Sequence, residues 1–213
     1  AFMKEIDAFP AHLVGHSWGA FICLLAAIAR PEAVRSLVLM EPPVLSLFVS
    51  TPPRPGELFK TLLHRPRTAL AIVKFGATAV APAQKAYRRG DDGRGFEIFG
   101  RGVLGKKAFE QLSPARRKQS WENRATDKAQ LLGQGFPPLE DDDVRGVRKP
   151  VLLMHGQKSP TIFHLLADRL EDLLPNVERL EVPRASHIVH EDNPRAVNEA
   201  VLAFLKRLTS ATR

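Results

Sequence analysis

The chain has 213 residues, of which 44% are apolar and 25% charged, and its formal net charge is +8. This composition is typical of a globular protein, and the length is sufficient for a sizeable hydrophobic core. No apolar run is as long as a membrane span, and the first ten residues lack the pattern of a secretory signal. The basic residues are scattered and no nucleic-acid-binding motif accompanies them, so we expect neither a membrane nor nucleic acid as a partner.

Cysteine usage sets an expectation for the compartment. Cys23 is the single cysteine and lies within the apolar run AFICLLAAIA. A lone cysteine in such a run predicts a buried, inert thiol, and a chain without an internal disulfide fits a reducing compartment. We therefore expect a cytoplasmic protein.

Both ends of the chain alternate short apolar runs with helical periodicity. The runs HLVG (12–15) and SLVLM (36–40) lack polar alternation and predict buried strands, and VLLMH (151–155) and VERLEV (177–182) are predicted as two more. Helices are predicted at 18–29, from Pro160 onwards, and at 194–208, where apolar residues recur at helical spacing. Strands that alternate with helices predict an α/β fold whose sheet is mostly parallel.

The middle of the chain, 42–148, has a different character. It contains helical stretches around 57–75 and 113–132, loops rich in Pro and Gly, and no clear strand. A structureless loop of this length would be unusual, so we predict an inserted helical cap. The organisation is then a first core segment (1–41), the cap (42–148) and a second core segment (149–213), with EDDDVR (140–145) as a solvated approach to the next strand.

A short Gly-rich segment carries the main functional signal. Gly15-His16-Ser17-Trp18-Gly19 fits the G-x-S-x-G pattern between a predicted strand and a predicted helix, which is the context that this motif requires. Ser17 is therefore the candidate nucleophile on a tight turn, where bulky side chains at either glycine would clash. The alternative is a Gly-rich connection with an incidental serine.

A serine hydroxyl needs a base, and His187 is the best-placed of seven histidines. His187 lies between the last predicted strand and the last helix, beyond the carboxyl ends of the strands, where parallel sheets build their sites. His190 is its rival. His16 adjoins the nucleophile but is expected to point elsewhere around the turn.

Three segments of the chain together resemble one known family. LVGHSWGA resembles the nucleophile turn of the cap-containing serine α/β-hydrolases, PVLLMHGQKSP their penultimate strand, and ASHIVHEDNPRAVNEAVLAFL their histidine loop and final helix. The resemblance implies a partial α/β-hydrolase fold with about four strands and a helical cap. It also implies a Ser–acid–His triad that works through an acyl-enzyme.

The position of the acid departs from the family pattern. The family usually carries an aspartate just after the penultimate strand, whereas this chain has Ser159 there, and a hydroxyl cannot stabilise an imidazolium as a carboxylate does. As the residue before Pro160, Ser159 is predicted to cap the helix that follows. Asp168, the next acid along the chain, is expected to face solvent.

Glu41 is the predicted acid, because it ends the strand that neighbours the nucleophile strand and keeps the order Ser17, Glu41, His187. A surface glutamate at the start of the cap is the alternative. Glu191 and Asp192 are weaker candidates, since they are too close to His187 along the chain to reach behind it.

The second departure is that the nucleophile comes early, so the family's first four strands and one oxyanion-hole donor are expected to be missing; the backbone N–H of Trp18 would supply the other donor. The missing strands would leave an apolar edge strand open. We predict a hydrolase that cleaves an ester or an activated C–C or acyl bond of a small apolar substrate. The alternative is a truncated, impaired hydrolase-like protein or ligand-binding module.

No cofactor or metal site is expected, because the histidines lack partners at ligand spacing. The sequence sets no expectation for the oligomeric state. Aromatic residues of the cap are candidates either for a substrate pocket or for packing: Phe48, Phe59, Phe75, Phe96, Phe99 and Trp121.

Overall fold

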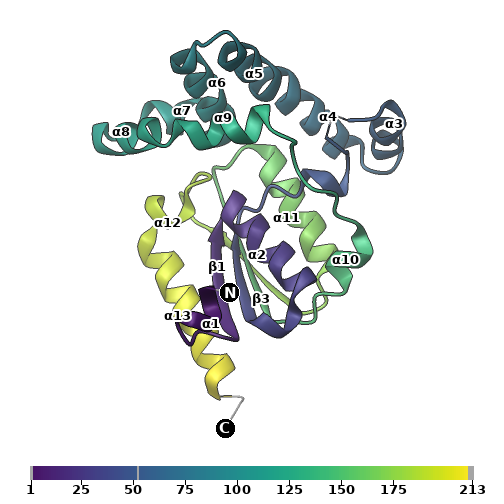
Figure 1. Ribbon diagram of the computed structural model, residues 1–213, viewed down its shortest axis with the longest axis vertical. Helices are drawn as coiled ribbons and strands as arrows, with labels where there is room; N and C mark the ends of the chain where they lie inside the picture. Colours follow the sequence, from purple (N-terminus) through teal and green to yellow (C-terminus); the bar gives the residue numbers. More distant parts are fainter. Residues whose placement is uncertain (1, 52, 211–213) are drawn as a thin grey trace. The chain divides into compact units, whose positions relative to one another are not determined.

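The computed structural model describes residues 2–51 and 53–210, and within them four strands form a single parallel sheet (Figure 1). The strands are β1 (Ala11–His16), β2 (Val34–Met40), β3 (Val151–Gly156) and β4 (Val177–Val182), in the spatial order β1-β2-β3-β4. Every neighbouring pair is parallel. The predicted fold class and the positions of all four strands are therefore confirmed, but the prediction that all four are buried is wrong for β1 and β4, each of which has a single buried residue.

The chain divides into two compact units. The core unit comprises Ala1–Val44, Leu139–Ser159 and Phe163–Arg213, and the helical unit comprises Leu45–Pro138 with Pro160–Ile162. The long segment of the helical unit lies within the predicted insertion, 42–148, whereas the segment after Pro138 packs with the core unit. Part of that segment, expected as a solvated approach, instead forms the short helix α10 (Asp141–Arg145), which buries Val144.

Helices cover both faces of the sheet in the core unit. Figure 1 shows α13 (Pro194–Ser210) on one face, and α2 (Trp18–Ala29) and α11 (Thr161–Leu173) on the other. Alternate residues of β2 and β3, such as Val38 and Leu152, form one apolar cluster with Val197 and Phe204 of α13. The remaining short elements of this unit are α1 (Phe2–Glu5), η1 (Pro31–Ala33) and α12 (Val189–Asp192).

β1 lies at one edge of the sheet. Among the described residues its only strand partner is β2, and the side chain of Val14 is 51% exposed. β2 and β3 are central, and all their residues except Arg35 are buried, as the apolar runs 37–40 and 151–154 predict. The sites at the carboxyl ends of these strands are therefore carried by a rigid, buried frame.

The helical unit contains more helix than the sequence indicated. Its elements are η2 (Leu45–Leu47), α3 (Pro55–His64), α4 (Pro66–Phe75), the π-helical turn η3 (Gly76–Val80), α5 (Ala81–Arg88), α6 (Asp92–Leu104), α7 (Lys106–Glu110), α8 (Pro114–Glu122) and α9 (Arg124–Leu132). The predicted stretches correspond to α3, α4, α8 and α9. The helices α5, α6 and α7 were not predicted.

Glycines explain why α6 escaped prediction. Glycine lowers helix propensity, and α6 contains four of them. A Cβ at Gly95 would lie 2.8 Å from the ring of Tyr87, and one at Gly100 would clash with the ring of Phe109. These glycines therefore serve close packing, and they hide the helical periodicity that neighbouring residues would otherwise show.

Aromatic rings pack against one another in the same unit, where Phe96 and Phe109 are buried and Trp121 is 36% exposed. The ring of Phe96 lies 5.7 Å from that of Phe109 and 5.6 Å from that of Trp121, both edge to face. Phe96 and Trp121 are therefore packing residues.

Over the described residues, no helix combines the length and the apolar character needed to cross a membrane.

Candidate active site

Ser17 lies between the end of β1 and the start of α2, in a strained backbone conformation. Its φ is 50° and its ψ is −121°, a combination that non-glycine residues rarely adopt and that clusters at functional sites. Its N–H donates to the carbonyl of Met40 at 2.8 Å, which ties the turn to the end of β2. The turn therefore has the strand-to-helix geometry expected of a nucleophile in G-x-S-x-G.

The two glycines of the motif have different roles. A Cβ at Gly15 would lie 2.5 Å from the carbonyl oxygen of Gly19 and 2.6 Å from the nitrogen of Ala20. A Cβ at Gly19 would meet nothing within 4 Å. The expected steric requirement holds at Gly15, and it is wrong at Gly19, because that position faces open space at the first turn of α2.

Glu41 directly follows β2 and is only 2% exposed. Its Oε2 lies 2.5 Å from Nδ1 of His187, and its Oε1 accepts from the N–H of Gly156 at 2.6 Å. Oε1 also accepts from the hydroxyl of Ser159. Both carboxylate oxygens are thus bonded inside the protein, which a buried carboxylate requires, so the alternative of a surface glutamate is excluded.

Ser159 does not have the role that the sequence suggested. Its hydroxyl donates to Glu41, across 118 positions of the chain, and the residue is buried. It was predicted to cap the following helix, and that prediction is wrong. The signal in the sequence was the position of Ser159 just after β3, and its partner Glu41 directly follows the neighbouring strand β2.

His187 lies buried against Glu41, with its ring 4.2 Å from the ring of Phe163. Because Nδ1 is occupied by Glu41, Nε2 is the nitrogen left for proton transfer. Within residues 2–51 and 53–210, no hydrogen bond joins His187 to the Ser17 hydroxyl. Such bonds are often long in unliganded enzymes and tighten with substrate.

The loop that carries His187 approaches the sheet closely. A Cβ at Gly156 would clash with the carbonyl oxygen of Ser186. Asp192 fixes the loop from the other side, accepting from the N–H of Ser186 at 2.7 Å and from its hydroxyl at 2.6 Å. Asp192 therefore shapes the loop, and Glu41 holds the imidazole.

His16 was expected to point away from the site, and this expectation is wrong. Its Nε2 lies 2.8 Å from the backbone oxygen of His187, and its ring lies 4.8 Å from that of His187 and 4.7 Å from that of His190. Burial, followed by the charges of His187 and His190, lowers the pKa of His16 to about 3. His16 is thus neutral at neutral pH, with Nε2–H donating to His187.

The rival acids and bases lie elsewhere. Nε2 of His190 lies 3.8 Å from Glu191, with which it can pair when protonated. The carboxylate of Asp168 pairs with Arg179 at 2.7 Å, and its side chain is half exposed, as predicted. Among the described carboxylates, Glu41 alone bonds to His187.

A second group of titratable side chains lies on β3, α11 and β4. His155, His164 and Glu181 place potential ligand atoms within 4.8 Å of one another, a proximity that sequence spacing did not reveal. However, the guanidinium of Arg179 lies 3.3 Å from Nδ1 and 3.4 Å from Nε2 of His155. A divalent cation would meet this positive charge, so the cluster is better described as an ion-pair network.

The sequence of residues 1–200 matches the family model described as the alpha/beta hydrolase family. The chain is 24% identical over 204 residues to the sn-1-specific diacylglycerol lipase ABHD11 of Mus musculus, covering 95% of this chain and 61% of that protein. The chain therefore spans about three fifths of the length of that relative.

Solved structures resemble the fold over a similar span. The carboxylesterase CesB (YbfK) from Bacillus subtilis superposes with a TM-score of 0.64 at 24% identity, covering 96% of this chain and 62% of that one. The naproxen esterase from the same organism superposes with a TM-score of 0.61 at 21% identity, with the same coverage. At this identity the likeness shows the fold alone, whereas the family match extends over most of the sequence. The chain belongs to the alpha/beta hydrolase family.

Proposed function

We propose that this chain carries the catalytic triad of a serine hydrolase, with Ser17 as nucleophile, His187 as general base and Glu41 as the acid that orients it. The observation that carries the proposal is the buried bond between Glu41 Oε2 and His187 Nδ1, at 2.5 Å. A carboxylate on Nδ1 fixes the tautomer in which Nε2 accepts a proton, and it stabilises the imidazolium that forms.

In the first half of the reaction, Nε2 of His187 takes the proton of the Ser17 hydroxyl as Oγ attacks the acyl carbon. The carbonyl oxygen becomes an oxyanion beside the N–H of Trp18, the first residue of α2, where the helix N-terminus favours negative charge. The intermediate then collapses. The acyl bond to the leaving group breaks, and the leaving group departs with the proton from His187.

In the second half, water replaces the leaving group. His187 removes a proton from the water as its oxygen attacks the acyl-enzyme. The second tetrahedral intermediate expels the Ser17 oxygen, which regains its proton from His187. The product is a carboxylic acid, and the enzyme returns to its starting state.

The surroundings of His187 support an apolar substrate. Phe163 packs against the imidazole, and the neutral His16 brings no charge to this side of the site. An ester or an activated acyl or C–C bond of a small apolar molecule fits both the serine chemistry and this environment. The names of the relatives, a diacylglycerol lipase and carboxylesterases, support the ester.

A serine-directed fluorophosphonate probe tests the proposal. The folded protein is expected to be labelled at Ser17, with labelling abolished in Ser17→Ala and unchanged in Ser120→Ala, an exposed serine of α8. Peptide mapping of the adduct identifies the labelled residue. Absence of labelling in a folded sample, or labelling that persists in Ser17→Ala, would refute the assignment.

A further inference from the structure

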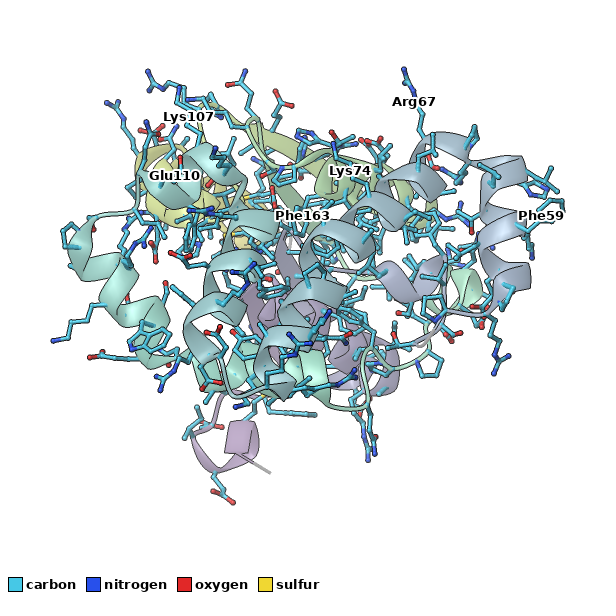
Figure 2. All side chains as sticks on the ribbon, turned by 90° about the horizontal axis from the view of Figure 1, so that it is seen from above. Phe59, Arg67, Lys74, Lys107, Glu110 and Phe163 are labelled. Carbon is cyan, nitrogen blue, oxygen red and sulfur yellow. The ribbon has the colours of Figure 1, made fainter. Side chains whose placement is uncertain are left out.

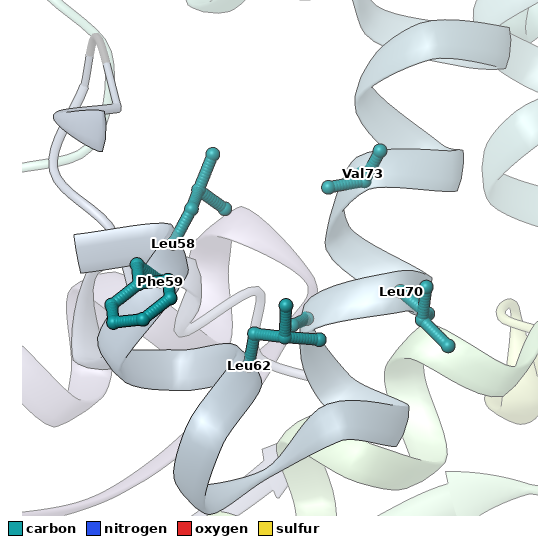
Figure 3. Close-up of a pocket in the computed structure, with 6 residues that line it drawn as sticks. Leu58, Phe59, Leu62, Leu70 and Val73 are labelled. Carbon is teal, nitrogen blue, oxygen red and sulfur yellow. The ribbon is translucent and has the colours of Figure 1, made fainter. Parts of the chain in front are cut away.

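The helices α3 and α4 of the helical unit form a hairpin with an open apolar groove between them (Figure 3). The groove has a volume of about 300 Å³ and is lined by Leu58, Phe59, Leu62, Ala69, Leu70 and Val73. Phe59 is 61% exposed and Leu70 is 65% exposed. The lining is thus presented to solvent by the described chain.

Exposed apolar side chains are concentrated on this hairpin. Of the eleven large hydrophobic residues that are exposed in the described chain, five belong to α3 and α4: Phe59, Leu62, Leu63, Leu70 and Val73. Single exposed apolar residues are ordinary on protein surfaces, but a contiguous group of them marks a surface that binds a partner or a membrane. The hairpin is such a surface.

The charge of the protein is concentrated over the same part of the chain. Residues 42–90 contain eight Lys and Arg and one acidic residue, Glu57, which gives +7 of the total +8. The Glu57 carboxylate accepts from the N–H and hydroxyl of Ser50 at 2.9 and 2.8 Å and from the N–H of Arg54 at 3.0 Å. The only negative charge of this segment is therefore held in local hydrogen bonds.

Both helices of the hairpin also carry exposed positive side chains. Lys60 of α3 is exposed, as are Arg67 and Lys74 of α4. Figure 2 shows Phe59 and Arg67 at the periphery of the unit, with Lys74 between them and Lys107. Helices that present exposed apolar residues on one face and Lys or Arg on their polar face are the pattern of helices that lie in the interface of an anionic membrane.

We propose that the α3–α4 hairpin docks onto the surface of an anionic phospholipid bilayer. Phe59 and the leucines enter the boundary between head groups and acyl chains, while Arg67, Lys74 and Lys60 contact lipid phosphates. This proposal replaces the expectation, drawn from composition, that the protein meets no membrane; the contact is peripheral and needs no spanning helix.

The spread of the charge favours a bilayer over a protein partner. The positive residues continue beyond the groove onto α5, with Lys85 and Arg88, and to Arg89. A peptide in the groove would meet only the charges at its rim. An anionic bilayer is extended, so its surface potential also acts on cations that lie beyond the groove, and each Lys or Arg near it strengthens binding about fivefold.

Vesicle flotation with the full chain tests the proposal. The protein is expected to float with vesicles of phosphatidylcholine mixed with phosphatidylglycerol, to remain behind with pure phosphatidylcholine, and to dissociate as salt is raised. Ser17→Ala should bind equally well, so that failure of docking and failure of the catalytic assignment are distinguished. The proposal is overturned if the protein does not bind the mixed vesicles. This holds also if an acidic amphipathic peptide or a second copy of the chain binds to the hairpin instead.

Paired variants locate the contact. Phe59→Ser with Leu70→Ser removes two inserted side chains and should weaken binding by at least about tenfold. The control is Leu202→Ser, which changes a 56% exposed leucine of α13. Equal loss in the control and in the hairpin variant would contradict the proposal.

The charge pair Arg67→Glu with Lys74→Glu should weaken binding by at least about 25-fold, since each reversal removes a cation and adds an anion. Its control is Lys107→Glu, an exposed lysine of α7 that Figure 2 places across the unit from Phe59. Circular dichroism confirms that each variant is folded. Unchanged binding of the charge pair would refute the electrostatic part of the proposal.

Discussion

Replacement of Glu41 by glutamine changes one atom of the proposed triad and leaves its shape intact. In the native protein three groups point hydrogens at the carboxylate: the N–H of Gly156 and the hydroxyl of Ser159 at Oε1, and His187 at Oε2. A glutamine side chain has one acceptor oxygen and one NH2 group. Two donors converge on the Oε1 position, so the amide oxygen will occupy it.

The NH2 group of the introduced glutamine then faces Nδ1 of His187 and donates to it. The imidazole is thereby held in the other tautomer, with its proton on Nε2, where it cannot accept the proton of Ser17. The equivalent change from Asp to Asn in a serine protease lowers kcat about 10⁴-fold, which corresponds to about 5.4 kcal/mol of transition-state stabilisation. Because the oxygen keeps both donors, we expect the free energy of unfolding to change by only about 1 kcal/mol.

The assay is hydrolysis of a p-nitrophenyl ester, with urea unfolding measured on the same samples. Glu41→Gln should lose about four orders of magnitude in kcat with little change in KM. Asp168→Asn serves as the control, because that carboxylate pairs with Arg179 away from His187. Activity of Glu41→Gln within about tenfold of the wild type would refute the tautomer argument and move the orienting role to another group.

Three further predictions follow from the same region. Ser159→Ala removes one of the two donors to Oε1 of Glu41, and it should lower kcat by about tenfold and the free energy of unfolding by about 1.5–3 kcal/mol. Ser159→Thr should retain the native kcat and stability. An effect of Ser159→Ala on stability alone would limit Ser159 to a structural role. Gly15→Ala should destabilise by about 1–3 kcal/mol or more through its backbone clash, while Gly19→Ala should be neutral or stabilising in urea unfolding; equal effects would contradict the difference in space. Burial depresses the pKa of His16 from 6.5 to about 3, so as the pH falls His16 is protonated in the unfolded chain before it is protonated in the folded protein. The free energy of unfolding should therefore fall as the pH drops from about 6.5 towards about 3. A His16→Gln variant whose stability depends on pH as that of the wild type does would exclude His16 as the cause.

The fold of the core was predictable because its two central strands, β2 and β3, are buried on both faces. β2 and β3 each contain four consecutive apolar residues, 37–40 and 151–154, and the helices beside them carry apolar residues at helical spacing, so each segment signals its own conformation. The helical unit gave a weaker signal. In α6, close contacts with Tyr87 and Phe109 require glycine, and glycine is the residue that most obscures a helix.

The candidate site was predictable where chain order and topology determine proximity. Ser17, Glu41 and His187 each follow a strand, and parallel strands bring their carboxyl ends to one edge of the sheet. What remained hidden depends on the direction of side chains. Neither the bond from Ser159 to Glu41 nor the bond from His16 to the backbone of His187 has a signature in local sequence, since each joins residues more than a hundred positions apart.

At Ser17 and Glu41 the backbone conformation lowers the stability of the protein, while the side chains carry the proposed chemistry. Their φ angles are 50° and 49°, a region where glycine is relaxed and other residues are strained, at a cost of about 1–3 kcal/mol each. Selection for heat resistance alone would therefore favour glycine at position 17 and erase the proposed nucleophile, whereas glycine at position 41 would leave Gly156, Ser159 and His187 without their buried acceptor. Any thermostabilised variant of this protein should therefore be assayed for esterase activity before its stability is counted as an improvement.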